Sequence, residues 1–224
     1  MKIWEKSICL ALVFTILVSF TGFTARCENI PNHVLRLHIL ANSDSNADQA
    51  LKLKVRDRIL QESAGMLDGV KSREDAEKVV SQNLEKIRAI AQQEVYHQGY
   101  RYPVKAELTN MYFPTRQYGN VTLPAGMYNA LRITIGSGSG HNWWCVIFPA
   151  LCLPAAEAPS KISDVLDQNE TEMVCNEDQY VVKFKVVELY EQFRNWIQDQ
   201  PIFRNSNEQQ STESVSSAVE SSVN

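Results

Sequence analysis

Apolar and polar side chains change their spacing once between residues 34 and 60. Residues 34–40 alternate loosely, which predicts a strand buried mainly on one face. Residues 41–46 are small and polar and predict a turn. From Ser45 the apolar side chains step by four residues, as in an amphipathic helix, and Asp48 completes a capping-box spacing with Ser45. The stretch therefore predicts a strand that enters a capped helix through a polar turn.

A second helical pattern follows a glycine-containing break. Ser72 and Asp75 repeat the capping-box spacing, and an apolar stripe continues to about His97, before Gly99 as a natural C-cap. We expect the two helices to pack side by side on one face of a sheet. The stripe consists of Ala76, Val80, Leu84, Ile87 and Ala91.

The second half of the chain returns to strand patterns. Residues 104–109 and 131–135 alternate, whereas residues 143–148 are almost continuously apolar, which predicts a central or doubly covered strand. The sequence GSGSG at 136–140 is predicted to join the last two strands as a hairpin, because glycines supply positive φ angles.

The spacing of apolar residues over 180–198 favours a C-terminal helix that Pro201 ends. The tail at 205–224 is rich in Ser, Gln, Asn and Glu and is predicted to be disordered. The fold prediction is therefore a single α+β domain over residues 30–200, with a mainly antiparallel sheet, two antiparallel helices and a C-terminal helix.

Residues 1–27 have the pattern of an export segment. Lys2 and Lys6 precede an apolar run over residues 8–20, and no further charge occurs before Arg26. Small residues at Gly22 with Thr24, or at Ala25 with Cys27, offer cleavage sites, but the charge-free span is also long enough to cross a bilayer. A cleaved signal and a retained anchor both stay open.

The composition of the chain bears on its domain count and on the partners it can bind. The 224 residues are 44% hydrophobic and 21% charged, which suits one globular domain with a real core. The formal net charge of -4 gives no indication of nucleic-acid binding.

The polar turn places oxygen-bearing side chains at Asn42, Asp44, Asn46 and Asp48, the alternation found in calcium loops. The EF-hand pattern fails, because the required glycine and terminal glutamate are missing in either register. Helix capping explains the same residues, so we predict no metal and no cofactor.

No catalytic motif surrounds any of the four histidines. A hydrolase assembled from His38, Ser43, Asp44 and Cys145 would need these residues to converge in the fold. The GSGSG sequence does not predict a phosphate loop, because a strand pattern follows it instead of a helix.

Cys145 and Cys152 are separated by six residues. In an exported chain they favour a disulfide, with a buried thiol at Cys145 as the alternative. Trp143 and Trp144 point to opposite faces of their strand. A core role for both is favoured, because most large aromatic residues are core residues. The alternative is that one lies in the core while the other is exposed, covered by a helix or offered to a partner.

Two long strings also resemble the signature of the stage II sporulation protein R family of endospore-forming Firmicutes. They are RLHILANSDSNADQALKLKVRD, from Arg36, and LPAGMYNALRITIGSGSGHNWWCVIFPALC, from Leu123. With the order of elements between them, the resemblance covers roughly residues 30–200.

The resemblance implies a sporulation signalling protein without enzymatic activity, exported from the forespore into the space between the septal membranes. There it would activate a membrane-embedded aspartic protease of the mother cell, which processes the precursor of the early mother-cell sigma factor. An exported cell-wall or septal hydrolase, and a structural module bridging the membranes, are the alternatives. As candidate partner contacts we name residues of the polar turn and of the tryptophan strand: Asn42, Ser43, Asp44, Asp48, Asn142, Trp143 and Trp144.

Overall fold

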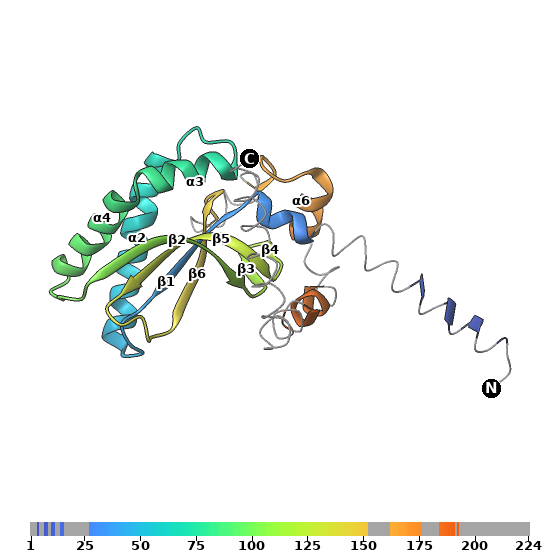
Figure 1. The fold of residues 1–224 in the computed structure, drawn as a ribbon, viewed down its shortest axis with the longest axis horizontal. Coiled ribbons are helices and arrows are strands. Elements are labelled where there is room, and N and C mark those ends of the chain that lie inside the picture. The colour runs from blue at the N-terminus through green and yellow to red at the C-terminus, as the bar shows by residue number, and fades with distance from the viewer. Residues whose placement is uncertain are drawn as a thin grey trace, which may run out of the picture.

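The computed structural model describes residues 27–151, 162–175 and 184–190, together with residues 4, 7, 8, 10, 11, 14, 15 and 192. Figure 1 shows the arrangement of these segments, with α4 and α6 at opposite ends of the molecule. The elements are η1 (Ile30–Asn32), β1 (Leu35–Leu40), α2 (Asn46–Met66), α3 (Arg73–Gln82), α4 (Leu84–His97), β2 (Val104–Phe113), β3 (Arg116–Tyr118), β4 (Val121–Leu123), β5 (Gly126–Ile135), β6 (Asn142–Phe148) and α6 (Gln168–Cys175).

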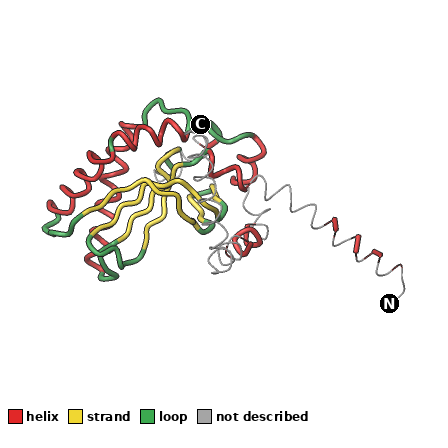
Figure 2. Tube along the Cα trace, in the orientation of Figure 1, coloured by secondary structure: helices red, strands yellow, loops and turns green. Residues whose placement is uncertain are grey.

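The main sheet has four strands in the order β2-β5-β1-β6. Figure 2 shows the strands in yellow beside the red helices. The pairs β2–β5 and β1–β6 are antiparallel, whereas β1 and β5 are parallel. The predicted α+β class with a mainly antiparallel sheet is therefore confirmed. A smaller two-stranded sheet pairs β3 with β4.

One face of the main sheet packs against α2, α3 and α4. Apolar side chains of β1 and β5 meet the predicted helical stripes there, and burial of this apolar surface is the main stabilising contribution. Among the helix pairs, α2 and α4 have the most extensive contact, as expected for neighbouring helices on one face. The central residues of this core are Leu37, Ile39, Val55, Ile87, Ala91, Leu131 and Ile133.

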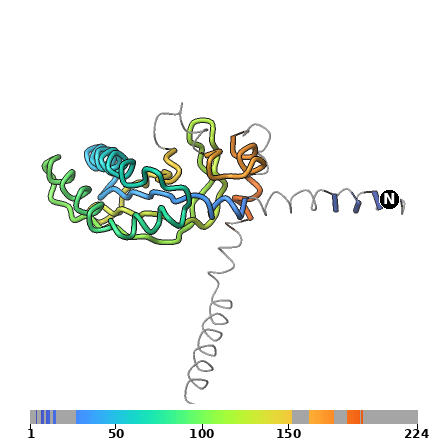
Figure 3. The backbone as a smooth tube through the Cα atoms, turned by 90° about the horizontal axis from the view of Figure 1, so that it is seen from above, coloured from blue at the N-terminus to red at the C-terminus, as the bar shows by residue number. Residues whose placement is uncertain are grey.

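The opposite face is covered at one end by the β3–β4 hairpin, by α6 and by the helical residues 184–190. In the view from above, α6 lies at the side of the sheet away from α4 (Figure 3). The predicted C-terminal helix is thus present in its described part.

All six residues of β1 are buried, so the expectation of one buried face was wrong. The reason is that β1 lies between β5 and β6 and has a core on either side.

The predicted helix over residues 72–97 is divided at Asn83 into α3 and α4. Asn83 leaves helical geometry, with φ -105° and ψ 11°, and its side-chain Nδ2 donates to the Val79 carbonyl at 2.8 Å. An asparagine side chain that bonds the preceding turn competes with helix continuation. The predicted cap at Gly99 is confirmed by its φ of +84° and by the Tyr100 N–H, which donates to the Val95 carbonyl.

The predicted hairpin between β5 and β6 was wrong. The strand β1 lies between them, so residues 136–141 cross over the end of β1. The strand β6 is an edge strand, so the expectation of a central strand was wrong. Its last four residues are buried and contribute to both cores, as expected for the alternative, a doubly covered strand. Alternation indicates which face a side chain occupies, but it does not indicate which strands are neighbours.

Among the described residues, no helix combines the length and the apolar character needed to span a bilayer. Most of the predicted export segment, and the whole predicted disordered tail, lie outside those residues. The domain boundaries at 1–27, 30–200 and 205–224 stay predictions.

Candidate functional site

Two polar segments meet at one edge of the main sheet. They follow the carboxyl ends of β1 and β5, which lie together because these two strands are parallel. We call residues 42–48 and 136–142 the turn–loop site. It joins the polar turn identified from the sequence to the glycine-rich loop.

Asn42 holds the two segments together. Its backbone carbonyl accepts hydrogen bonds from Ser137 Oγ at 2.7 Å and from Ser139 Oγ at 2.9 Å. Its side-chain Oδ1 accepts from the backbone N–H of Ser137 at 3.0 Å. One asparagine therefore bonds the loop through both its backbone and its side chain.

Asp48 is the buried anchor of the polar turn, with 4% of its surface exposed. Its Oδ2 accepts from Asn42 Nδ2 at 2.9 Å and from Ser43 Oγ at 2.5 Å. The hydrogen bond from Ser43, followed by those from Asn42, Tyr102 and Ser45, lowers the pKa of the Asp48 carboxyl group against the effect of its burial. The predicted cap is confirmed, because Ser45 Oγ accepts from the Asp48 N–H at 3.1 Å.

The glycines of the loop permit close approach to the turn. A Cβ on Gly140 would lie 2.2 Å from the Ser43 carbonyl oxygen, and one on Gly136 would lie 2.2 Å from Asn42 Oδ1. Gly136 also has a φ of +61°, which side chains disfavour. These glycines therefore allow the loop to pack onto the turn at the end of β1.

Asp44 and His141 form the exposed part of the site. The His141 backbone N–H donates to Asp44 Oδ1 at 2.6 Å, and the His141 ring nitrogen Nδ1 contacts the same oxygen. The backbone hydrogen bond from His141, followed by that from its ring, lowers the pKa of Asp44. The side chains of Asp44 and His141 remain 55% and 80% exposed.

Lys52 is buried beneath Asp44 and His141, with 4% of its surface exposed. Its Nζ donates to the His141 carbonyl at 2.8 Å and to Gln49 Oε1 at 2.6 Å. Burial lowers the pKa of the Lys52 ammonium group. Sequence reasoning missed the roles of Lys52 and His141, because their contact joins residues 89 positions apart.

The two tryptophans occupy opposite faces of β6, as predicted. Trp143 faces the helices, where the Arg56 guanidinium lies 4.4 Å from its ring centroid. Trp144 faces the other way and stacks on His38, with ring centroids 4.2 Å apart. Both tryptophans are half-buried, whereas Asn142 at the start of β6 is exposed.

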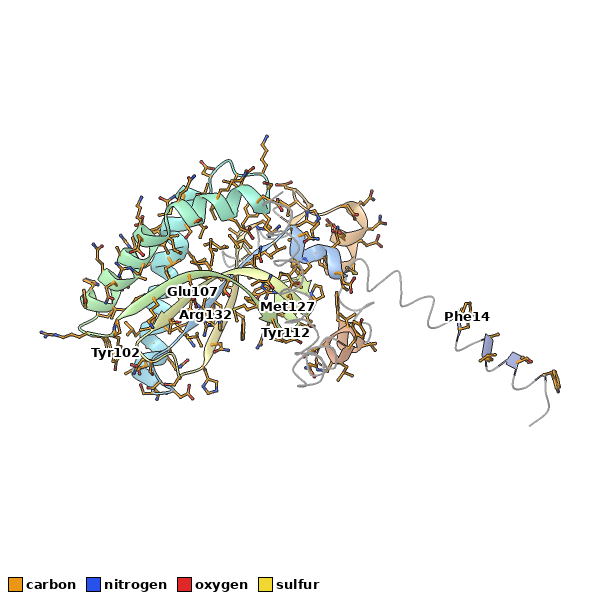
Figure 4. The ribbon with its side chains drawn as sticks, viewed as in Figure 1. Phe14, Tyr102, Glu107, Tyr112, Met127 and Arg132 are labelled. Atoms are coloured by element: carbon orange, nitrogen blue, oxygen red, sulfur yellow. The ribbon has the colours of Figure 1, made fainter. Side chains whose placement is uncertain are left out.

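A row of polar side chains crosses the sheet beside Trp144. Arg132 on β5 lies between His38 on β1 and Glu107 on β2, with 3.5 Å between Arg132 Nη1 and Glu107 Oε1 (Figure 4). Burial, followed by the positive charge of Arg132, lowers the pKa of His38 to about 4, and the Asn142 side chain partly opposes this shift. His38 is therefore a neutral ring at physiological pH.

The four residues of the hydrolase hypothesis do not form one constellation. His38 stacks on Trp144, Ser43 donates to Asp48, and Asp44 contacts His141. Cys145 belongs to the core on the helical face. Within the described residues, no group of three His, Cys, Asp or Glu side chains could hold a metal ion.

The proposed cysteine pairing stays a prediction. Cys145 is fully buried in β6, whereas Cys152 lies outside the described residues. In the part of the chain that the structure describes, neither Cys27 nor Cys175 belongs to a disulfide.

Comparison with known proteins yields one family and one curated relative. The family model described as stage II sporulation protein R matches residues 31–158. The stage II sporulation protein R of Bacillus subtilis (strain 168) is 43% identical over 123 residues. That match covers 55% of this chain and 55% of the relative, just over half the length of each. No solved structure matches.

Proposed function

This chain belongs to the stage II sporulation protein R family, and from that membership we propose that it is an exported signalling protein of sporulation. In this proposal it acts in the space between the two septal membranes. It activates a membrane-embedded aspartic protease, which then processes the precursor of the early mother-cell sigma factor. Its contribution is binding and not catalysis.

The observation that carries this proposal is the position of the turn–loop site within the family match. Both segments of the site, residues 42–48 and 136–142, fall inside the matched residues 31–158. The export segment predicted from Lys2, Lys6 and the apolar run after them supports a role outside the cytoplasm.

The turn–loop site is suited to binding because its exposed groups rest on a buried support. Asp44, His141 and Asn142 are exposed, whereas Lys52 and Asp48 beneath them are buried and hydrogen-bonded. A preorganised polar surface loses little conformational freedom when a partner binds. We therefore assign the contact to Asp44, His141 and Asn142, with Trp144 beside them.

Binding at this surface would activate the protease by stabilising its active, dimeric state. A protein ligand shifts such an equilibrium only by its difference in affinity for the two states. The turn–loop site must therefore fit the active state of the extracytoplasmic part of the protease better than the inactive state.

The test is reconstitution in a non-sporulating host. The full chain is co-expressed with the protease and the sigma-factor precursor, and precursor cleavage is followed on a blot. We expect cleavage that requires both this chain and its export segment. Absence of cleavage, with all three proteins present and export verified, would contradict the proposal.

Substitutions at the site then test the surface. Asp44→Ala and Asn142→Ala remove exposed groups, so we expect reduced cleavage with an unchanged thermal unfolding midpoint. Glu85→Ala is the matched control, because Glu85 is exposed on α4, away from the site. Cleavage at the wild-type level in both Asp44→Ala and Asn142→Ala would place the contact elsewhere.

A further inference from the structure

A cavity lies away from the turn–loop site, at the carboxyl end of α2. Its walls come from the last turns of α2, the turn at 67–70, the end of β6 and residues 164–165. Its volume is about 360 Å³, near the lower end of the range for ligand pockets. The walls are mainly apolar, with Leu60, Ile147, Phe148 and Val165 among them.

One polar side chain in the wall lacks a partner. Ser63 is 3% exposed, and its Oγ has no hydrogen-bond partner among the described residues. A buried hydroxyl without a partner costs about 1–3 kcal/mol. Because Ser63 lines the cavity, its hydroxyl can bond a group that enters from outside.

Two carboxylates add negative charge to the same cavity. Asp68 in the turn after α2 and Asp164, next to Val165, both line it, and both are exposed. Neither takes part in an ion pair between described residues. The cavity therefore combines apolar walls, an unused hydroxyl and two unpaired acidic groups.

We infer that this cavity holds a segment of the protease in which a large apolar side chain stands next to a lysine or arginine. The apolar side chain fills the space between Leu60, Ile147 and Val165. The basic side chain reaches Asp68 and Asp164, and the segment's backbone bonds Ser63 Oγ. The inference rests on the proposed function, since it names the kind of segment by which the same protease is held.

The chemistry favours a basic peptide segment over other occupants. The long stems of lysine and arginine pack on apolar surface while their charged ends stay at the water boundary. An acidic or phosphorylated segment would be repelled by Asp68 and Asp164. A neutral apolar segment would leave the two carboxylates without a role in binding.

The reconstitution assay tests this inference with full-length variants. In Ala64→Trp a large ring on an exposed residue of the cavity wall obstructs entry, and in the double variant Asp68→Lys with Asp164→Lys the charge is reversed. We expect each to reduce precursor cleavage about tenfold or more. Ala50→Trp is the matched control on α2, because Ala50 is exposed and does not line the cavity.

A charge exchange identifies the segment. Single Lys or Arg residues in the extracytoplasmic part of the protease are changed to Glu and combined with the double lysine variant. Restored cleavage at one such position supports the inference. Wild-type cleavage by the double lysine variant overturns it, even if Ala64→Trp fails to fold. Failure of the wild-type chain itself to cause cleavage would instead overturn the proposed function.

Discussion

His38 and Trp144 lie almost parallel on neighbouring strands, with an angle of 10° between their rings and 4.2 Å between ring centroids. The pair forms on the sheet face opposite the helices, where β1 and β6 meet. This packing buries a titratable ring next to the positive charge of Arg132. The contact therefore links the stability of the fold to pH.

We expect the fold to lose stability as the pH falls from about 6.5 towards 4. The pKa of His38 is about 4 in the folded chain against an ordinary value of 6.5, so protonation favours the unfolded state. The contribution is fully present above pH 6.5, and its loss is about 3 kcal/mol by pH 4. Chemical denaturation at several pH values measures this slope.

His38→Phe keeps a ring against Trp144 but cannot titrate, so it should flatten the slope between pH 6.5 and 4. His97→Gln, at an exposed histidine on α4, is the control and should leave the slope unchanged. Carboxylates with lowered pKa values, such as Asp48, also make stability depend on pH. Their effect falls near and below the pKa of the unfolded carboxyl group, which is more acidic than the range of His38. An unchanged slope in His38→Phe would contradict the assignment.

Removal of the Asp48 carboxylate should release the polar turn. Asp48→Ala leaves Asn42 Nδ2 and Ser43 Oγ without their shared acceptor, and we expect a loss of about 3 kcal/mol in unfolding free energy. Denaturant titration at pH 7 measures it. Asp57→Ala, at an exposed residue of α2 paired with Arg56, should change stability by less than about 1 kcal/mol. Equal effects of the two substitutions would refute the anchoring role.

A methyl group on Gly140 should displace the loop from the turn. Its Cβ would lie 2.2 Å from the Ser43 carbonyl oxygen, and we expect a loss of more than about 2 kcal/mol. Gly65→Ala is the matched control, since its Cβ meets nothing within 4 Å and the residue lies in α2. There the substitution should stabilise by about 0.5–1 kcal/mol. Thermal unfolding of both variants measures these changes. A Gly140→Ala variant as stable as the wild type would contradict the close packing of the loop on the turn.

Arg36 is a fully buried cation whose guanidinium group is surrounded by aromatic rings. Its guanidinium carbon lies 4.2 Å from the Phe113 ring centroid and 4.7 Å from that of Tyr128, and its Nη2 donates to Tyr118 Oη at 2.6 Å. Its Nε and Nη1 have no hydrogen-bond partner among the described residues.

Because this buried cation has no carboxylate partner among the described residues, Arg36→Met should cost less than about 1.5 kcal/mol. Arg36→Ala leaves a cavity and should cost about 3 kcal/mol or more. Denaturant midpoints compare the two variants, with Arg88→Ala on the surface of α4 as control. A loss in Arg36→Met as large as in Arg36→Ala would show that the charge itself stabilises the fold.

The sequence by itself determined the local elements. Apolar periodicity located β1, α2, β6 and parts of β2 and β5, because each period places one set of side chains on one face. It did not indicate the short strands β3 and β4. Ser45, Ser72 and Gly99 were correctly identified as helix caps, since capping depends on residues a few positions apart. The two signature strings, which begin at Arg36 and Leu123, indicated the family on the same local information.

The tertiary structure alone decided which elements are neighbours. The chain order of β5 and β6 suggested a hairpin, yet β1 lies between them, and only this arrangement brings the glycine loop onto Asn42 and Asp44. Asp48 was a candidate contact and is a buried anchor, while His141 and Lys52 entered the site through contacts across the sheet edge. Strand pairing and burial depend on the whole chain at once, so no local pattern contains them.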